Sequence, residues 1–67
     1  MSLSTCIIHI YFDDGDDGYF VRWEDDGFRW TENIELAAEV SYYNFFNIKE
    51  RLLEMDGVKS VYEETLY

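Results

Sequence analysis

The chain has 67 residues, which is enough for one domain with one core, and we expect that domain to span residues 1–67. With 48% hydrophobic and 19% aromatic residues it has the composition of a folded protein, and no apolar run is long enough to span a bilayer. A single cysteine, Cys6, excludes an internal disulfide, and without a secretory pattern we expect a cytoplasmic protein.

The net charge is −10, from fifteen acidic and five basic residues. Residues 1–39 hold ten acids and two bases, a net of −8, and residues 40–67 hold five acids and three bases, a net of −2. Such a field attracts basic proteins and repels nucleic acid and anionic membranes, so we expect no direct binding to either. Solubility is the alternative explanation of the acidity, and the sequence leaves both open.

Residues 5–12 are β-branched and aromatic, which predicts a strand with apolar side chains on both faces. Alternation places Cys6, Ile8, Ile10 and Phe12 on one face and Ile7, His9 and Tyr11 on the other. The following residues 13–18, DDGDDG, predict a loop, because two glycines permit positive φ and four aspartates repel one another in a regular ladder.

Residues 19–31 predict a β-hairpin, because two β-prone runs flank an Asp-Asp-Gly sequence. With Asp26-Gly27 as the two-residue turn, Glu24 is expected to face Arg29 and Trp23 to face Trp30.

From Asn33 the apolar period changes to that of a helix, and the helical stripe continues to Met55. A straight helix over 33–56 would be about 36 Å long, longer than a domain of this size is wide. We therefore expect a break near 40–43 with Ser41 capping a second helix; an overhanging end packed on another subunit is the alternative.

Residues 57–67 predict a last strand that returns to the sheet. The predicted fold class is α+β, a three- to four-stranded antiparallel sheet in β-β-β-α-β order with one long or broken helix packed on one face.

The sequence offers little for catalysis, and we expect no enzyme and no cofactor. Cys6 and His9 are three residues apart on a strand, so they point to opposite faces and cannot form a nucleophilic pair. Two Cys or His residues are too few for a structural zinc site. From Asp13 to Glu24 the sequence matches several positions of an EF-hand loop, but Gly15 offers no ligand at the third position and the flanks predict strands, so no metal site is predicted.

The thirteen aromatic residues exceed what a two-layer domain of this size buries, and Tyr42, Tyr43, Phe45 and Phe46 would surround more than half of a helix. Some of them either are exposed or meet a partner, and Tyr and Trp are favoured interface anchors. A homodimer through this helix face is the alternative to a core in which aromatic residues replace aliphatic ones.

The expected function is binding of a basic partner by acidic residues on the loop at 13–18 and the hairpin tip at 24–26, at the ends of adjacent strands. The predicted partner-binding residues are Asp13, Asp14, Asp16, Asp17, Glu24, Asp25, Asp26 and Glu32.

In size, in its DDGDDG and EDDG clusters and in its aromatic-rich α+β pattern, the chain resembles small acidic anti-defence proteins of phages and mobile elements, such as anti-CRISPR and DNA-mimic anti-restriction proteins. That resemblance implies a stoichiometric inhibitor that docks on the nucleic-acid-binding surface of a CRISPR effector or nuclease. A structural module that dimerises, or an antitoxin- or immunity-like protein, is the alternative.

Overall fold

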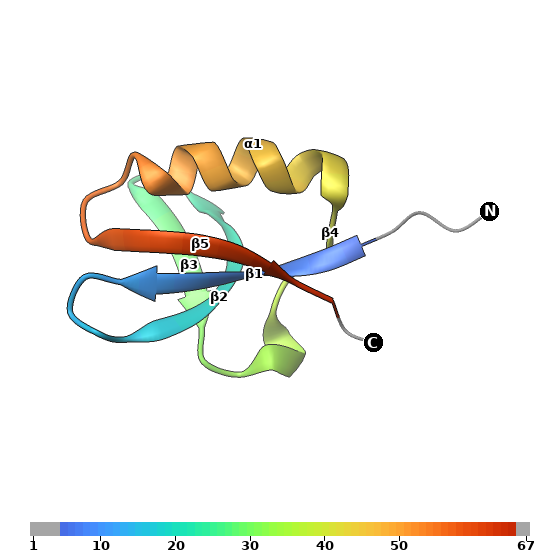
Figure 1. The fold of residues 1–67 in the computed structure, drawn as a ribbon, viewed down its shortest axis with the longest axis horizontal. Helices are drawn as coiled ribbons and strands as arrows, with labels where there is room; N and C mark the ends of the chain where they lie inside the picture. The colour runs from blue at the N-terminus through green and yellow to red at the C-terminus, as the bar shows by residue number, and fades with distance from the viewer. Residues whose placement is uncertain (1–4, 66–67) are drawn as a thin grey trace.

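Five strands, one α-helix and one short 3-10 helix make up the part of the chain that the computed structural model describes, residues 5–65. In chain order they are β1 (Thr5–Phe12), β2 (Asp17–Glu24), β3 (Gly27–Thr31), η1 (Ile34–Leu36), β4 (Val40–Ser41), α1 (Tyr42–Leu53) and β5 (Val58–Glu64). The predicted α+β class is confirmed, with α1 lying along one side of an antiparallel sheet (Figure 1).

The sheet is built around β1. β2 and β5 pair antiparallel with β1 on its two sides, β3 continues the sheet beyond β2, and the two-residue strand β4 pairs with Thr5 and Cys6. The central position explains why β1 is apolar on both faces, as its sequence predicts, since residues 6–10 are all buried. The last strand lies where expected, and Leu66 and Tyr67 of the predicted segment lie outside the described residues.

The connection between β1 and β2 is shorter than the predicted loop at 13–18. The N–H of Gly15 donates to the carbonyl of Phe12, and Gly15 has a φ of +96°, which glycine adopts without strain. These features make a three-residue hairpin loop of residues 13–15. Asp17 and Gly18 therefore belong to β2, opposite Tyr11 and Ile10, and their assignment to a loop was wrong.

The second hairpin forms as predicted, but its turn begins one residue earlier, which shifts the cross-strand partners next to the turn by two residues. Asp25 and Asp26 occupy the turn, Glu24 pairs with Gly27 and Trp23 pairs with Phe28. Trp30 instead lies opposite Phe20, because a bulge between Phe20 and Arg22 shifts the pairing. The expected Trp23–Trp30 pair is therefore wrong. Glu24 does not face Arg29 as expected, because Arg29 lies opposite Arg22. The two side chains nevertheless form an ion pair, with an Oε2–Nε distance of 3.2 Å.

The predicted helical segment is broken, as expected, and only its second half is α-helical. Ser41 caps α1 by accepting a hydrogen bond from the Asn44 N–H at 3.2 Å, and Gly57, with a φ of +89°, lies in the turn that leads to β5. The first half is different from the prediction: Asn33 caps the single turn η1, and residues 40–41 become the strand β4.

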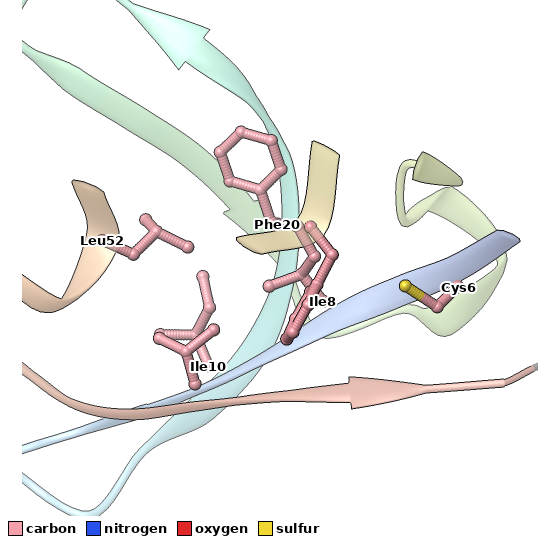
Figure 2. Packing of buried hydrophobic residues seen from close by; sticks show 7 residues of the cluster. Cys6, Ile8, Ile10, Phe20 and Leu52 are labelled. Atoms are coloured by element: carbon pink, nitrogen blue, oxygen red, sulfur yellow. The ribbon is translucent and has the colours of Figure 1, made fainter. Parts of the chain in front are cut away.

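The core lies between α1 and the sheet. Cys6, Ile8 and Ile10 of β1 share it with other buried side chains, namely Phe20, Phe45, Leu52 and Val61. Figure 2 shows Ile10 of β1 and Leu52 of α1 across this layer. The faces predicted for β1 are therefore confirmed, because Cys6, Ile8 and Ile10 join the core while His9 lies on the face that α1 does not cover.

Candidate functional site

Three acidic segments meet around Trp30 at one end of the molecule. On one side of Trp30 a hollow is lined by Phe12, Gly57 and the aspartates of the β1–β2 turn, Asp13, Asp14 and Asp16. Trp30 also borders a second hollow, which is lined by Phe28, Met55, Asp26 and Asp56. We call Trp30 with Asp13, Asp14, Asp16, Asp26 and Asp56 the acidic end.

This meeting is unexpected for a flat sheet, in which the turns before and after β2 lie at opposite ends of the strand. The bulge between Phe20 and Arg22 accounts for it, because a bulge bends the strand and increases its twist. The connection after α1 adds Asp56, since the Asp13 N–H donates to the Gly57 carbonyl at 2.9 Å and holds that connection against the β1–β2 turn.

Trp30 lies flat against the sheet because Gly18 leaves room for its ring. A Cβ atom at Gly18 would stand 2.2 Å from Cε3 of Trp30, far inside van der Waals contact. The ring also packs on Phe12, with 4.8 Å between the centroids. The side chain keeps 38% of its surface exposed, so an aromatic surface remains open among the carboxylates.

The two hollows beside Trp30 are acidic, although Lys59 lines a neighbouring hollow together with Phe12 and Asp16. Neither hollow beside Trp30 has a lysine or arginine among its lining residues. Arg22 and Arg29 instead bind Glu24, at 3.4 Å and 3.2 Å. Arg51 stands 4.0 Å from the ring centroid of Trp23, in a cation–π contact. A cationic side chain that reached Trp30 would meet carboxylates and an aromatic surface together.

The eight predicted binding residues do not form one surface. Asp13, Asp14, Asp16 and Asp26 belong to the acidic end, and Asp25 is beside Asp26 in the hairpin turn. Glu24 is engaged with arginines, and Asp17 bonds His9 on the face of the sheet that α1 does not cover. Glu32 lies just beyond β3, outside both hollows.

Two members of the acidic end, Trp30 and Asp56, were missed by sequence reasoning. Asp56 could have been included from the sequence, because it stands directly before Gly57, where the helix is predicted to end and the connection to the last strand begins. No sequence pattern identifies Trp30 as part of this site, because the residues that surround it are brought there by the bend of β2.

The two candidate nucleophilic residues are separated as their spacing predicts. Cys6 is fully buried in the core under α1, and burial, followed by the charge of Glu63, raises the pKa of its thiol. His9 is on the opposite face, bonded to Asp17 and Glu64.

The stretch that matched parts of an EF-hand loop forms a hairpin turn and the strand β2, with Asp17 and Glu24 at the two ends of that strand. Within residues 5–65 no three His, Cys, Asp or Glu side chains are grouped so that they would hold a metal ion. In the same range, no helix has the length and apolar character needed to cross a bilayer.

Comparison with known proteins assigns no family. No protein-family model, curated protein or solved structure significantly matches the chain.

Proposed function

We propose that the chain is a non-catalytic acidic binding protein whose acidic end occupies a basic, nucleic-acid-binding surface of another protein. The observation that carries the proposal is the gathering of five carboxylates from three connections around the exposed ring of Trp30. The anti-defence class that the sequence resembles would make the partner a host defence protein, such as a CRISPR effector subunit or a nuclease.

Two properties of the acidic end support this function. Aspartate is a short side chain, so its charge stays close to the turns that carry it. Two of those turns are joined by the hydrogen bond between the Asp13 N–H and the Gly57 carbonyl. Because these turns are already held in place, less conformational entropy is lost when a partner binds. Trp30 adds a surface on which an arginine guanidinium stacks, so that recognition does not depend on charge alone.

The test compares two variants with the same net charge. One replaces Asp13, Asp16, Asp26 and Asp56 by Asn. The control replaces by Gln four exposed glutamates that line neither hollow beside Trp30 and are not among the predicted binding residues, namely Glu35, Glu39, Glu50 and Glu63. Asp17 is left intact because it bonds His9. Four surface ion pairs at about 0.2–1 kcal/mol each correspond to a loss of roughly 4- to 700-fold in affinity.

The tagged proteins are incubated with nuclease-treated bacterial lysate and washed with rising salt. We expect the unmodified chain and the control to retain a basic nucleic-acid-binding protein that salt and added DNA or RNA release, and the Asn variant to lose it. Equal retention by both variants would contradict a role for the acidic end, because total charge alone would then explain the binding.

A second candidate function is supported by the outer side of α1. Tyr43 is 85% exposed and Phe46 is 60% exposed, and together with Tyr42 and Asn47 they line a shallow hollow. α1 contains Lys49, Glu50 and Arg51 and so has a net charge of +1 in a chain of −10. Two copies of the chain would therefore repel each other least through this helix, and the fitting occupant is a second copy.

This dimer and the acidic binding protein respond differently to salt. A dimer that buries Tyr43 and Phe46 persists or strengthens as salt rises, and the double change Tyr43→Ser and Phe46→Ser abolishes it. Sedimentation of the unmodified chain and of this variant at low and high salt measures the difference. A monomer in all four samples would contradict the assembly function and leave the acidic end as the binding surface.

A further inference from the structure

His9 joins three neighbouring strands on the face of the sheet that α1 does not cover. Its Nε2 atom lies 2.6 Å from Oδ2 of Asp17, and its Nδ1 atom bonds the carboxylate of Glu64. Asp17 belongs to β2 and Glu64 to β5, and both strands pair with β1 along residues 9–11. They must therefore lie on opposite sides of β1, and the imidazole links all three strands.

The surroundings of His9 are aromatic and acidic. The residue is 8% exposed, and its ring packs on Tyr11, at 4.5 Å between centroids, and on Tyr19, at 4.7 Å. The titratable groups that face it are Tyr11 on β1, Asp17 and Tyr19 on β2, and Tyr62 and Glu64 on β5. Asp17 and Glu64 are the charged groups among these, so the charge of a protonated ring is matched by carboxylates on both sides.

The two carboxylates distinguish between the protonation states of the ring. A protonated imidazole has two N–H donors, one for each carboxylate, whereas a neutral imidazole has only one. Loss of the proton therefore leaves one carboxylate oxygen against a ring lone pair. The side chains of Asp17 and Glu64 are 52% and 38% exposed, so water reaches both carboxylates and reduces the cost of the lost hydrogen bond.

Burial alone lowers the pKa of His9, but the hydrogen bonds to Asp17 and Glu64, together with their charges, outweigh it and raise the pKa above the ordinary 6.5. The same cluster acts on Tyr19, whose pKa is raised by burial and then by the charges of Glu64 and Asp17. A histidine with a raised pKa in the folded state contributes its full stabilisation below pH 6.5. That stabilisation is lost as the pH rises through the folded-state pKa.

We propose that His9, Asp17 and Glu64 form a pH-sensitive clamp that holds β2 and the terminal strand β5 on β1 while the ring is protonated. Glu64 is at the end of β5, paired with Ile7, so opening the clamp loosens this end of the strand. The clamp is separate from the acidic end and operates whether or not a partner is bound.

The test uses the only histidine in the chain, so its ring signals in a proton NMR spectrum need no assignment. The pKa of His9 is measured by pH titration in the unmodified chain, in Asp17→Asn and in Glu64→Gln. Glu50→Gln is the control, because it removes the same charge from α1, on the opposite side of the sheet. Urea unfolding of the same four proteins is measured from pH 6 to pH 9.

We expect a His9 pKa above 6.5 that falls in both clamp variants and stays nearly unchanged in the control. We also expect the stability of the unmodified chain to fall between pH 6 and pH 9, and to fall less in the clamp variants. The amide substitutions are conservative, and the pKa comparison includes only variants that the urea measurement shows to be folded, because an unfolded chain has the ordinary histidine pKa with or without a clamp. A pKa at or below 6.5 in the folded chain, or an equal shift in Glu50→Gln, would overturn the proposal.

Discussion

Replacing Gly18 by alanine should dislodge Trp30 from its position on the sheet. The added Cβ atom would stand 2.2 Å from Cε3 and 2.7 Å from Cζ3 of Trp30. Ordinary carbon contacts begin near 3.5 Å, so the ring must move by about 1.3 Å. The carbonyl oxygen of Thr31, 3.0 Å from the same Cβ, restricts adjustment of the backbone. We therefore expect one of two outcomes. Either Trp30 loses its packing on Phe12, or the strands β2 and β3 separate locally.

The cost follows from the size of this clash. Overpacking of a filled site costs about 1–3 kcal/mol, and replacing glycine stabilises by about 0.4–1 kcal/mol through the unfolded chain. The net loss for Gly18→Ala is about 0–2.6 kcal/mol with a centre near 1.3 kcal/mol, and that central value lowers the Tm of a domain of this size by roughly 5–10 °C. Thermal unfolding followed by circular dichroism measures it.

A double-mutant cycle with Trp30→Ala separates the ring from the backbone. Without the ring the added methyl group has space, so Gly18→Ala should cost little in the Trp30→Ala background. Gly15→Ala is the matched control: nothing lies within 4 Å of its Cβ, and its cost comes from a φ of +96° and should be equal in both backgrounds. If Gly18→Ala costs the same with and without Trp30, the role assigned to Gly18 is refuted.

Three further predictions concern the core and the helix cap. Ser41→Ala removes the acceptor of the Asn44 N–H and should lower stability by about 1 kcal/mol, which thermal unfolding detects; no change would show that the cap is unimportant. Leu52→Ala, at a fully buried position, should cost about 2–5 kcal/mol in urea unfolding, whereas Leu52→Met should cost less than about 1.5 kcal/mol; equal costs would contradict the packing of α1 on the sheet. Cys6, buried and with a raised pKa, should react with a thiol reagent at pH 8 only as fast as the chain unfolds, and rapid reaction of the folded chain would contradict its burial.

Local patterns predicted the features that depend on local physics. Alternation assigned Cys6 and His9 to the correct faces of β1, and Ser41 was recognised as a helix cap because its side chain suits that position. The register of the second hairpin was wrong because Asp25-Asp26 and Asp26-Gly27 are both acceptable turns. Only the pairing of Trp23 with Phe28, set by packing, distinguishes between them.

Features that depend on contacts between distant segments could not be predicted from local sequence patterns. The segment before α1 keeps a helical apolar period, yet it forms η1 and then β4, since Thr5 and Cys6 offer it a strand partner. The acidic end depends on the bulge in β2, which no residue pattern marks. The contact between Asp17 and His9 could have been predicted in part. If the predicted strand had been extended to residue 17, alternation alone would have placed Asp17 on the same face of the sheet as His9.

The most direct test of the acidic end is a titration of the isotope-labelled chain with a hexa-arginine peptide, followed through the indole N–H signals of its two tryptophans. Trp30 is exposed among the carboxylates of the acidic end, whereas the ring of Trp23 is covered by Arg51. Trp23 lines a different hollow that holds Arg22 as well as Glu24, Asp25 and Asp26, so the two rings distinguish binding at the acidic end from binding at the hairpin tip in the same sample. We predict a saturable shift of the Trp30 signal, suppressed by salt, with little change at Trp23. Equal shifts at both rings, or shifts spread evenly over all acidic segments, would contradict a binding surface at the acidic end.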